Sequence, residues 1–257
     1  MNKTDFKDEC LAFPDLYDIY QSAVFEKAAL LESLREIISD YAEKNILDCS
    51  VGTGFVIIDL IKEGVDIVCA DGSSDMLKKF SLNAQSNGIK TRPIQIDWEN
   101  IGSTLPSMFD LILCRGNSIV YADMWDKENV IDSHEGIRAS LKGIFDSIKL
   151  GGKLYIDIPS DAKGKYLLGK DIDHHPKVIN GKSIRVSERI EECTTKMKRK
   201  WDVKLKIENT EYGFSRFSHL IKEKDFIAIL EDVGFKEIEK INSHGERNHH
   251  CAFLVSK

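Results

Sequence analysis

Residues 46–54 read Ile-Leu-Asp-Cys-Ser-Val-Gly-Thr-Gly, a short apolar run that ends in a tight glycine turn. The apolar part predicts a strand at residues 45–49, and the turn follows at residues 50–54. Glycine has no Cβ and tolerates unusual φ values, so a Gly-x-Gly turn lets the backbone approach a ligand closely. A helical segment at residues 55–62 comes next, and Gly64 ends it. A strand, a glycine turn and a helix in this order predict the start of a βαβ unit.

The same alternation of strands and helices extends along most of the chain. Short apolar runs predict further strands at residues 66–70, 92–96, 109–114 and 153–158. Apolar periodicity and flanking glycines predict helices at residues 23–41 and 75–87, and a long helix that ends near residue 149. Short strands that alternate with helices indicate a parallel sheet covered by helices on both faces.

This rhythm breaks between residues 161 and 220. Residues 183–190 and 201–207 alternate apolar and polar side chains, which is the period of half-exposed antiparallel strands. We therefore expect an inserted β lobe over the carboxyl edge of the sheet. The core then resumes with a helix at residues 223–233 and closing strands at residues 235–241 and 250–255.

The predicted fold is α/β: a Rossmann-like, doubly wound seven-stranded sheet with an inserted antiparallel β lobe. Residues 45–160 and 221–257 form the core in this interpretation, and residues 161–220 form the lobe over the acceptor site. Residues 1–44 precede the core as a helical lid segment. A chain of 257 residues has room for one such core and a small appended lobe.

The composition narrows the classes of function. The formal net charge of −6 argues against broad attraction to nucleic acid or to anionic membranes, which need an excess of Lys and Arg on one face. No run approaches the roughly 20 apolar residues that cross a bilayer. Residues 1–13 are charged and lack the apolar stretch of a signal peptide. The basic run Lys196–Lys200 is flanked by acidic residues and predicts a solvated hairpin.

The cysteines and histidines give no sign of a disulfide framework or a metal centre. Cys49, Cys69 and Cys114 lie in apolar runs, where a free thiol behaves as a small hydrophobe, and no CxxC pair occurs. This usage fits a reducing cytoplasm. The histidine pairs at residues 174–175 and 249–250 lack zinc-ligand spacing, so we expect no metal.

Asp71 turns the glycine turn into a nucleoside-binding signal. It stands 17 positions after Gly54, at the end of the second strand, where a carboxylate can accept both ribose hydroxyls. A dinucleotide fingerprint would need a third glycine at position 57, where the chain has Ile57. Asp48, just before the turn, disfavours a pyrophosphate but suits a cationic sulfonium. These residues favour S-adenosylmethionine over NAD as the bound nucleoside.

Several segments together resemble the class I S-adenosylmethionine-dependent methyltransferases. The segments that carry the resemblance are residues 46–55, 70–77, 95–98, 109–118 and the Leu-Gly-Gly turn at 150–152. Within that superfamily, Ala-Asp-Gly-Ser at 70–73, Asp-Trp at 97–98 and Gly-Asn-Ser at 116–118 are most similar to the glycine, sarcosine and dimethylglycine N-methyltransferases. The segment at residues 224–235 also resembles theirs.

The resemblance implies a role for each matched residue. Gly52 and Gly54 would pass close to the methionine portion of the donor, and Asp71 would hold the ribose. Met76 and Trp98 would flank the adenine. The full set that we predict to bind the cofactor is Asp48, Gly52, Thr53, Gly54, Asp71, Gly72, Ser73, Met76, Asp97, Trp98, Cys114 and Arg115.

The predicted acceptor side is built from fewer residues. Asn117 would lie beside the transferred methyl group and orient the acceptor. Tyr17 and Tyr20 look like the leading tyrosines that fold over the donor in many relatives, and an aromatic face is a good partner for a sulfonium or a methylated ammonium. Arg115 and His219 could each supply a charge or hydrogen bond. We therefore predict Asn117, Tyr20 and His219 as catalytic, and Asn117, Arg115 and Tyr17 as substrate-binding.

One departure from the resembled enzymes concerns the acceptor. They carry an arginine shortly after the fifth strand, and it clamps the carboxylate of the amino acid. This chain has Ile-Pro-Ser at residues 158–160, with Pro159 in place of the arginine. Without a bidentate guanidinium, that carboxylate site is missing. Glycine itself is therefore a doubtful acceptor.

The sequence predicts an enzyme that methylates the nitrogen of a small-molecule amine. Methylation of oxygen or carbon on a sugar or natural product remains an alternative, because related sequences share the same core. A third alternative is a non-catalytic module that binds S-adenosylmethionine. The expected partner is a small-molecule acceptor, and assembly into a homo-oligomer is left open.

Overall fold

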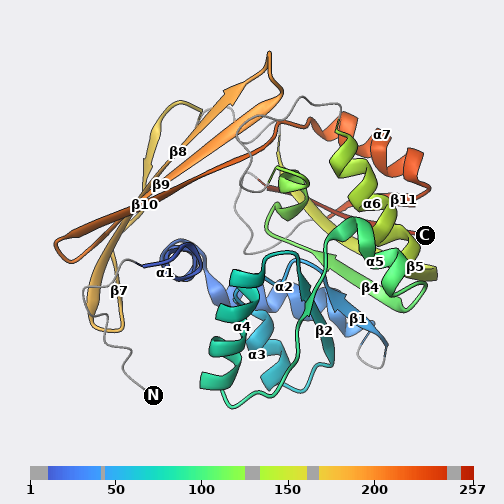
Figure 1. Cartoon of the computed structure of the whole chain (residues 1–257), viewed down its shortest axis with the longest axis horizontal. Coiled ribbons are helices and arrows are strands. Elements are labelled where there is room, and N and C mark those ends of the chain that lie inside the picture. Colours follow the sequence, from blue (N-terminus) through green and yellow to red (C-terminus); the bar gives the residue numbers. More distant parts are fainter. Residues whose placement is uncertain (1–10, 42–43, 125–133, 161–167, 242–249) are drawn as a thin grey trace.

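The computed structural model describes residues 11–41, 44–124, 134–160, 168–241 and 250–257. Within them, seven strands form one sheet in the order β11-β12-β5-β4-β1-β2-β3 (Figure 1). They are β1 (Ile46–Asp48), β2 (Ile67–Asp71), β3 (Ile94–Gln95), β4 (Phe109–Cys114), β5 (Ile148–Pro159), β11 (Lys236–Ile241) and β12 (His250–Ser256). The predicted α/β fold with a seven-stranded sheet is confirmed.

The sheet is mixed, whereas the alternation of strands and helices predicted a parallel one. Strands β1 to β5 are parallel neighbours, but β12 lies antiparallel between β5 and β11. Only residues 242–249 separate β11 from β12, and a parallel crossover needs about a dozen residues or more. A return of this length places β12 antiparallel to β11.

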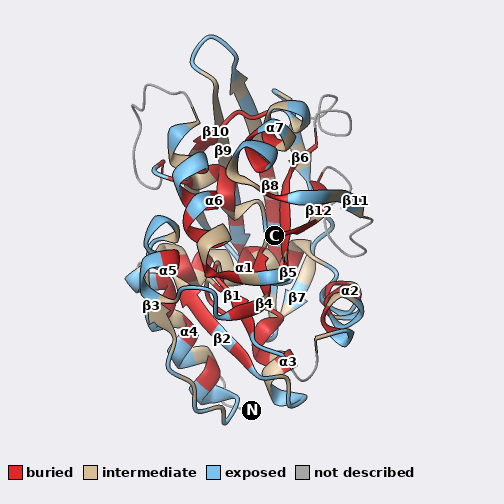
Figure 2. Ribbon diagram, turned by 90° about the vertical axis from the view of Figure 1, so that its right-hand side faces the viewer, coloured by how far each residue is buried: buried red, intermediate tan, exposed pale blue. Residues whose placement is uncertain are grey.

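The central strands bury side chains on both faces. Leu47 and Ile112 belong to one apolar cluster, whereas Ile46 and Leu111 belong to a second cluster on the opposite face. Helices α5 (Trp98–Thr104), α6 (Glu135–Ser147) and α7 (Glu223–Val233) cover the first face, and α2 (Lys27–Ser39), α3 (Ile57–Lys62) and α4 (Ser74–Ser86) cover the second (Figure 1). Buried residues therefore concentrate in the central strands and in the inner faces of the helices (Figure 2).

The helix predicted at residues 23–41 is wrong in its extent, because two helices occupy this part of the chain. Helix α1 (Phe13–Val24) ends at Phe25, whose backbone is extended with φ −90° and ψ 149°, and α2 then begins at Lys27. The break lets the two helices pack against different partners. Helix α1 packs against apolar residues at positions 184–207, and α2 packs on the core. Apolar spacing alone does not reveal that two neighbouring helices have different partners.

Helix α5 was not predicted, because its seven residues are too few to show a periodic pattern. It packs against α6, and glycines allow the two backbones to meet. A Cβ at Gly102 would lie 2.7 Å from the carbonyl oxygen of Gly143, and a Cβ at Gly143 would overlap the carbonyl of Trp98. The Asp97–Trp98 pair at the start of α5 is thereby held near the carboxyl edge of the sheet.

A second, antiparallel sheet is inserted between β5 and α7. Its strands are ordered β10-β9-β8-β6, with β7 also paired to β8. They are β6 (Asp171–Asp173), β7 (Lys177–Ile179), β8 (Lys182–Cys193), β9 (Lys198–Ile207) and β10 (Thr210–His219). The predicted strands at 183–190 and 201–207 lie inside β8 and β9, and Lys196–Lys200 runs from the turn between these strands into the start of β9. Strands β6, β7 and β10 were not predicted.

Helix α1 covers the inner face of this second sheet. Leu16 and Ile19 of α1 pack against Val186 of β8 and Leu205 of β9 in a third apolar cluster. Every helix in the described part of the chain is too short or too polar to cross a lipid bilayer. Residues 1–10 of the predicted lid and residues 161–167 of the predicted lobe lie outside the described residues, as does His249.

The close contact between α5 and α6 predicts that adding one methyl group at Gly143 destabilises the fold. Gly143→Ala should lower the free energy of unfolding by about 1–3 kcal/mol, because the new methyl group would overlap the backbone of α5. Urea denaturation measures this change. Lys142→Ala, at an exposed position of the same helix, serves as the control and should change stability by less than about 0.5 kcal/mol. Equal effects of the two substitutions would contradict the close contact.

Candidate donor and acceptor site

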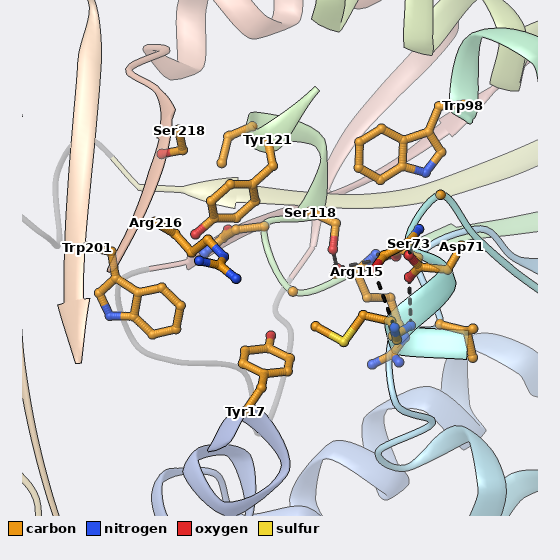
Figure 3. A pocket seen from close by; sticks show the side chains of 18 of the residues that line it. Tyr17, Asp71, Ser73, Trp98, Arg115, Ser118, Tyr121, Trp201, Arg216 and Ser218 are labelled. Atoms are coloured by element: carbon orange, nitrogen blue, oxygen red, sulfur yellow. Dashed lines mark hydrogen bonds between the residues drawn. The ribbon is translucent and has the colours of Figure 1, made fainter. Parts of the chain in front are cut away.

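A cavity of about 500 Å³ lies at the carboxyl ends of the parallel strands, between the core, α1 and the second sheet. Its volume falls in the usual range for small-molecule sites, and open α/β sheets bind ligands at this edge. Asp71, Ser73 and Arg115 lie on one side in Figure 3, and Trp201 and Arg216 lie on the other, with Tyr17 reaching in from α1. We call these the donor half and the acceptor half.

The two glycines of the turn after β1 have different tasks. Both have a positive φ, +56° at Gly52 and +88° at Gly54. A Cβ at Gly52 would meet no atom within 4 Å, and Gly52 lines the cavity. A Cβ at Gly54 would lie 2.6 Å from Cδ1 of Ile58 and 2.7 Å from Cδ2 of Phe80. Gly52 thus leaves room for a ligand, whereas Gly54 leaves room for α3 and α4.

Asp71 is placed to bind a polar ligand and to shape the turn at once. Its Oδ2 accepts a hydrogen bond from the Gly52 N–H at 2.9 Å, and its Oδ1 accepts one from the Ser73 N–H at 2.8 Å (Figure 3). Burial raises the pKa of Asp71 to about 6, although these two N–H groups lower it. The Asp48 carboxylate adds a smaller upward contribution. A carboxylate has lone pairs left for two ribose hydroxyls.

The charge of Asp48 is neutralised by Arg115, which the sequence predicted to bind the cofactor and the substrate. It is fully buried and does not line the cavity. Its Oδ1 accepts from the Ser50 N–H at 3.0 Å, and its Oδ2 accepts from Nε of Arg115 at 3.0 Å. Arg115 lines the cavity, but this ion pair draws its guanidinium toward the donor half. Arg115 is therefore engaged in joining β1 to β4.

The predicted adenine side is held by short polar contacts. A Cβ at Gly72 would lie 2.9 Å from Oδ1 of Asp97, so glycine permits that close approach. The Trp98 indole N–H donates to the Cys49 carbonyl at 2.7 Å, and the Met76 N–H donates to the Ser73 hydroxyl at 3.3 Å. All of these residues except Cys49 line the cavity.

Asn117 lines the cavity two residues after Arg115. It is in the left-handed conformation with φ +58°, and its N–H donates to Oδ1 of Asp157 at 2.7 Å. The Gly116 N–H donates to the other oxygen of Asp157 at 3.1 Å. Nδ2 of Asn117 lies 2.6 Å from Nε2 of His250. Its Oδ1 is buried and accepts no hydrogen bond within the described ranges.

Sequence reasoning missed Asp157 and His250. Asp157 is fully buried, and a carboxylate inside the apolar run at residues 154–158 was the signal that could have found it. His250 lines the cavity at the start of β12. No sequence signal links it to Asn117, because 133 residues separate the two.

The acceptor half is lined mainly by aromatic side chains and guanidinium groups. Tyr17 and Tyr20 come from α1, Trp201 from β9 and Arg216 from β10. The Cζ atom of Arg216 lies 3.6 Å from the centre of the Phe13 ring. The alternation at residues 201–207 places Trp201 on the inner face of β9, but only the folded chain brings it to the cavity.

The structure brings most of the predicted site residues together. Those that line the cavity are Tyr17, Tyr20, Gly52, Thr53, Asp71, Gly72, Ser73, Met76, Asp97, Trp98, Arg115 and Asn117. Asp48, Gly54, Cys114 and His219 do not line it. Cys114 is fully buried in the core, and Nε2 of His219 lies 2.8 Å from the Ala122 carbonyl. His219 therefore joins the second sheet to the core.

Metal ligands do not gather at this site. Among the residues that the structure describes, no three His, Cys, Asp or Glu side chains form a group that could hold a metal ion.

A comparison with protein families adds to this geometry. Residues 46–137, which include the glycine turn at residues 50–54 and Asn117, match a family model described as a methyltransferase domain. The chain carries a class I S-adenosylmethionine-dependent methyltransferase domain. The residues of the donor half fit this cofactor, because Gly52 leaves open space beside the carboxylate of Asp71.

Curated relatives of this methyltransferase domain match about half of the chain. A glycine/sarcosine N-methyltransferase of Parasynechococcus marenigrum (strain WH8102) is 28% identical over 151 residues. The match covers 56% of this chain and 52% of that protein, so the chain spans about half the length of the curated relatives it matches.

Solved structures match this chain over almost its whole length. An S-adenosylmethionine-dependent methyltransferase from Clostridium acetobutylicum superposes with a TM-score of 0.71 at 19% identity, covering 95% of this chain and 97% of that one. A sugar N-methyltransferase from a Streptoalloteichus species also gives a TM-score of 0.71, at 18% identity, covering 100% and 98%. At these identities the likeness shows the shared fold.

The pKa of Asp71 predicts how donor affinity depends on pH. Below about pH 6 the carboxyl takes up a proton and loses an acceptor site, so affinity for S-adenosylhomocysteine should fall as the pH drops from 7.5 to 5. Asp71→Asn should weaken binding at pH 7.5 by about 1–3 kcal/mol and flatten the pH profile. Isothermal titration calorimetry measures both effects.

Asp75→Asn is the matched control for this prediction. Asp75 lies four residues further along, and its side chain is exposed. This variant should keep the affinity and the pH profile of the unaltered protein. An unaltered protein whose affinity stays constant between pH 5 and 8 would argue against a role of Asp71 in binding.

Proposed function

We propose that this protein transfers a methyl group from S-adenosylmethionine to the nitrogen of a small-molecule amine. The observation that carries the proposal is Asn117, which lines the cavity and whose buried amide oxygen accepts no hydrogen bond within the described ranges. The relatives named as glycine/sarcosine N-methyltransferases support nitrogen as the methylated atom.

The donor half would hold the cofactor through four side chains and one bare backbone position. When bound, S-adenosylmethionine supplies a methyl group on a positively charged sulfur. Asp71 would accept hydrogen bonds from the ribose hydroxyls, and Met76 and Trp98 would hold the adenine between them. Gly52 admits the methionine portion because a side chain there would occupy the cavity. The Asp97 carboxylate would accept a hydrogen bond from the adenine amino group.

The role of Asn117 is to orient the acceptor. Methyl transfer is an in-line displacement, so the nitrogen must be held about 3 Å from the methyl group with its lone pair aligned. Asp157 fixes the backbone here by accepting from the N–H groups of Gly116 and Asn117, and the contact with His250 limits the freedom of the Asn117 side chain. The amide offers both a donor and an acceptor to an amine that binds in its neutral form. Transfer then needs positioning rather than a strong base.

Three parts of the chain would have separate roles in the reaction. Residues 45–160 and 221–257 hold the donor, residues 161–220 form the lobe over the acceptor, and residues 1–44 act as a lid. The cavity-lining positions of Tyr17 on α1 and Trp201 on β9 support this division. The buried cysteines of the described residues are free thiols, which supports a reducing cytoplasm as the place of the reaction.

An amino sugar is the second candidate acceptor. The solved sugar N-methyltransferase covers the whole of this chain, including the second sheet, whereas the curated glycine/sarcosine enzyme matches about half of it. Trp201 and Tyr17 offer flat aromatic faces on which a sugar ring can stack. Both candidates present an amine nitrogen to Asn117.

A methyl-transfer assay that follows S-adenosylhomocysteine tests the proposal. Amines, amino acids, amino sugars, hydroxylated sugars and phenols are offered in parallel. Turnover with an amine supports the proposal. Turnover confined to hydroxylated sugars or phenols indicates oxygen or carbon methylation instead. Donor binding without turnover on any acceptor indicates a non-catalytic binding module.

Replacing Asn117 should separate turnover from donor binding. We expect Asn117→Ala to lower kcat by about 100-fold, because the acceptor loses its orientation. The dissociation constant for S-adenosylhomocysteine should change less than about threefold, since Asp71 and Gly52 remain. Steady-state kinetics and calorimetry measure the two quantities.

Asn180→Ala is the matched control for this experiment. Asn180 is also left-handed, with φ +51°, but it lies in an exposed turn and does not line the cavity. It carries the same backbone strain and should keep normal turnover. A similar loss of kcat in both variants would show that the effect at Asn117 is structural.

The relative rates with different acceptors test the effect of having Pro159 where the resembled enzymes have an arginine. Pro159 lines the cavity, and Ser160 donates a hydrogen bond to Glu223, so this segment presents no guanidinium to a carboxylate. We expect glycine to be methylated with a kcat/KM at least about tenfold below that of a larger or already methylated amine. Kinetics on the unaltered protein measure the ratio. Efficient, saturable methylation of glycine would contradict the inference.

A further inference from the structure

A buried carboxylate stands directly behind the aromatic side of the acceptor half. Glu188 of β8 is 2% exposed, and it does not line the cavity. Its Oε2 accepts hydrogen bonds from the Tyr20 hydroxyl at 3.1 Å and from the Trp201 indole N–H at 2.8 Å. Both donors belong to rings that do line the cavity. Nε2 of His174 lies 2.7 Å from the other oxygen.

This arrangement suits a negatively charged carboxylate. The Trp201 indole N–H can only donate, and the Tyr20 hydroxyl donates to the same oxygen, Oε2. Burying a carboxylate is expensive, and these two hydrogen bonds, from β9 and α1, offset part of that cost. Glu188 is thereby held at a defined place behind Tyr20 and Trp201.

Tyr17, Tyr20 and Trp201 form a continuous aromatic wall. The rings of Tyr17 and Tyr20 are stacked with centres 6.1 Å apart, and those of Tyr20 and Trp201 meet edge to face at 5.0 Å. The face of such a ring attracts a cation. Hydrogen bonds to an anion polarise the groups that donate them, which makes the ring faces more attractive to positive charge.

The wall joins onto rings that already hold one cation. Phe13 stacks with Tyr17 at 5.6 Å, and its ring carries the Arg216 guanidinium at 3.6 Å. The folded protein thus already places one cation, the Arg216 guanidinium, in contact with this aromatic cluster. The wall offers the same kind of contact to a ligand inside the cavity.

We propose that Glu188 is a positioning residue that makes the aromatic wall a binding site for an ammonium group of the acceptor or of the methylated product. This inference rests on the proposed function. When the amine nitrogen attacks, the N–CH₃ bond forms, the S–CH₃ bond breaks with its electron pair left on sulfur, and the positive charge moves to nitrogen. A product nitrogen that carries a proton then loses it to solvent. A wall backed by an anion favours the charge in its final place.

The test compares two ligands of equal shape and different charge. Choline carries a quaternary ammonium, and 3,3-dimethyl-1-butanol has a carbon atom in place of that nitrogen. Each is titrated into the full-length protein saturated with S-adenosylhomocysteine, and tryptophan fluorescence or calorimetry reports binding. The unaltered protein should bind choline at least about tenfold more tightly than the neutral ligand.

Glu188→Gln isolates the charge from the geometry. Its amide oxygen can still accept from Tyr20 and Trp201, and its NH₂ group can donate to His174. The preference for choline should fall to less than about threefold, while affinity for 3,3-dimethyl-1-butanol changes less than about twofold. A purely structural role for Glu188 would leave the ratio of the two affinities unchanged.

Two further variants control for the loss of a charge elsewhere on the strand and for the loss of the aromatic wall itself. Glu191→Gln removes a like charge from an exposed position of the same strand and should keep the preference of the unaltered protein. Trp201→Leu removes one face of the wall and should lose the preference even though Glu188 remains. Unchanged affinity for S-adenosylhomocysteine shows that each variant is folded.

The outcomes are distinguishable from those of the proposed function. A preference for choline in the unaltered protein that disappears in Glu188→Gln supports the inference. A preference that survives in Glu188→Gln overturns it, as does an unaltered protein that shows no preference or binds neither ligand. The proposed function fails separately, when no amine yields S-adenosylhomocysteine in the turnover assay, whatever the two binding ratios are.

Discussion

Buried carboxylates that accept backbone N–H groups hold the turns on which the cavity depends. Asp71 binds the N–H groups of Gly52 and Ser73, and Asp157 binds those of Gly116 and Asn117. Each carboxylate ends or nearly ends a buried strand, so its place is set by the sheet. The turns that it holds are otherwise free to adopt several conformations, because glycine restricts the backbone little. A rigid sheet edge is thereby converted into two defined loops.

An ion pair between Asp48 and Arg115 neutralises a buried charge beneath this edge. Asp48 is fully buried, and Arg115 from the end of β4 compensates it. An unpaired carboxylate at this depth would cost several kcal/mol, so the pair also locks the two central strands to each other. The Arg115 guanidinium in the donor half therefore serves the fold, and the proposed reaction would use groups on the opposite side of the cavity for the acceptor.

The sequence predicted those parts of the fold that follow from local patterns. The strands around residues 46–48 and 109–114 and helix α7 were expected because their apolar runs and glycine stops are contiguous. The break at Phe25 and the short helix α5 escaped prediction, because each is set by what the segment packs against. The strand at residues 250–255 was predicted in the right place, but its antiparallel direction was not, for a similar reason. Pairing direction depends on the length of the return, whereas an apolar run looks the same either way.

By itself, the sequence determined the donor half, since Gly52, Asp71 and Trp98 follow strand ends whose order along the chain already brings them to one edge. Only the tertiary structure decided the acceptor half. Tyr20 and Glu188 are 168 residues apart, and Trp201 reaches them from a third element. No local pattern encodes such a contact, because it forms only when α1 packs across the second sheet and buries Leu16 and Ile19 against it. Apolar burial between distant segments, rather than any motif, brings those polar groups within hydrogen-bonding distance.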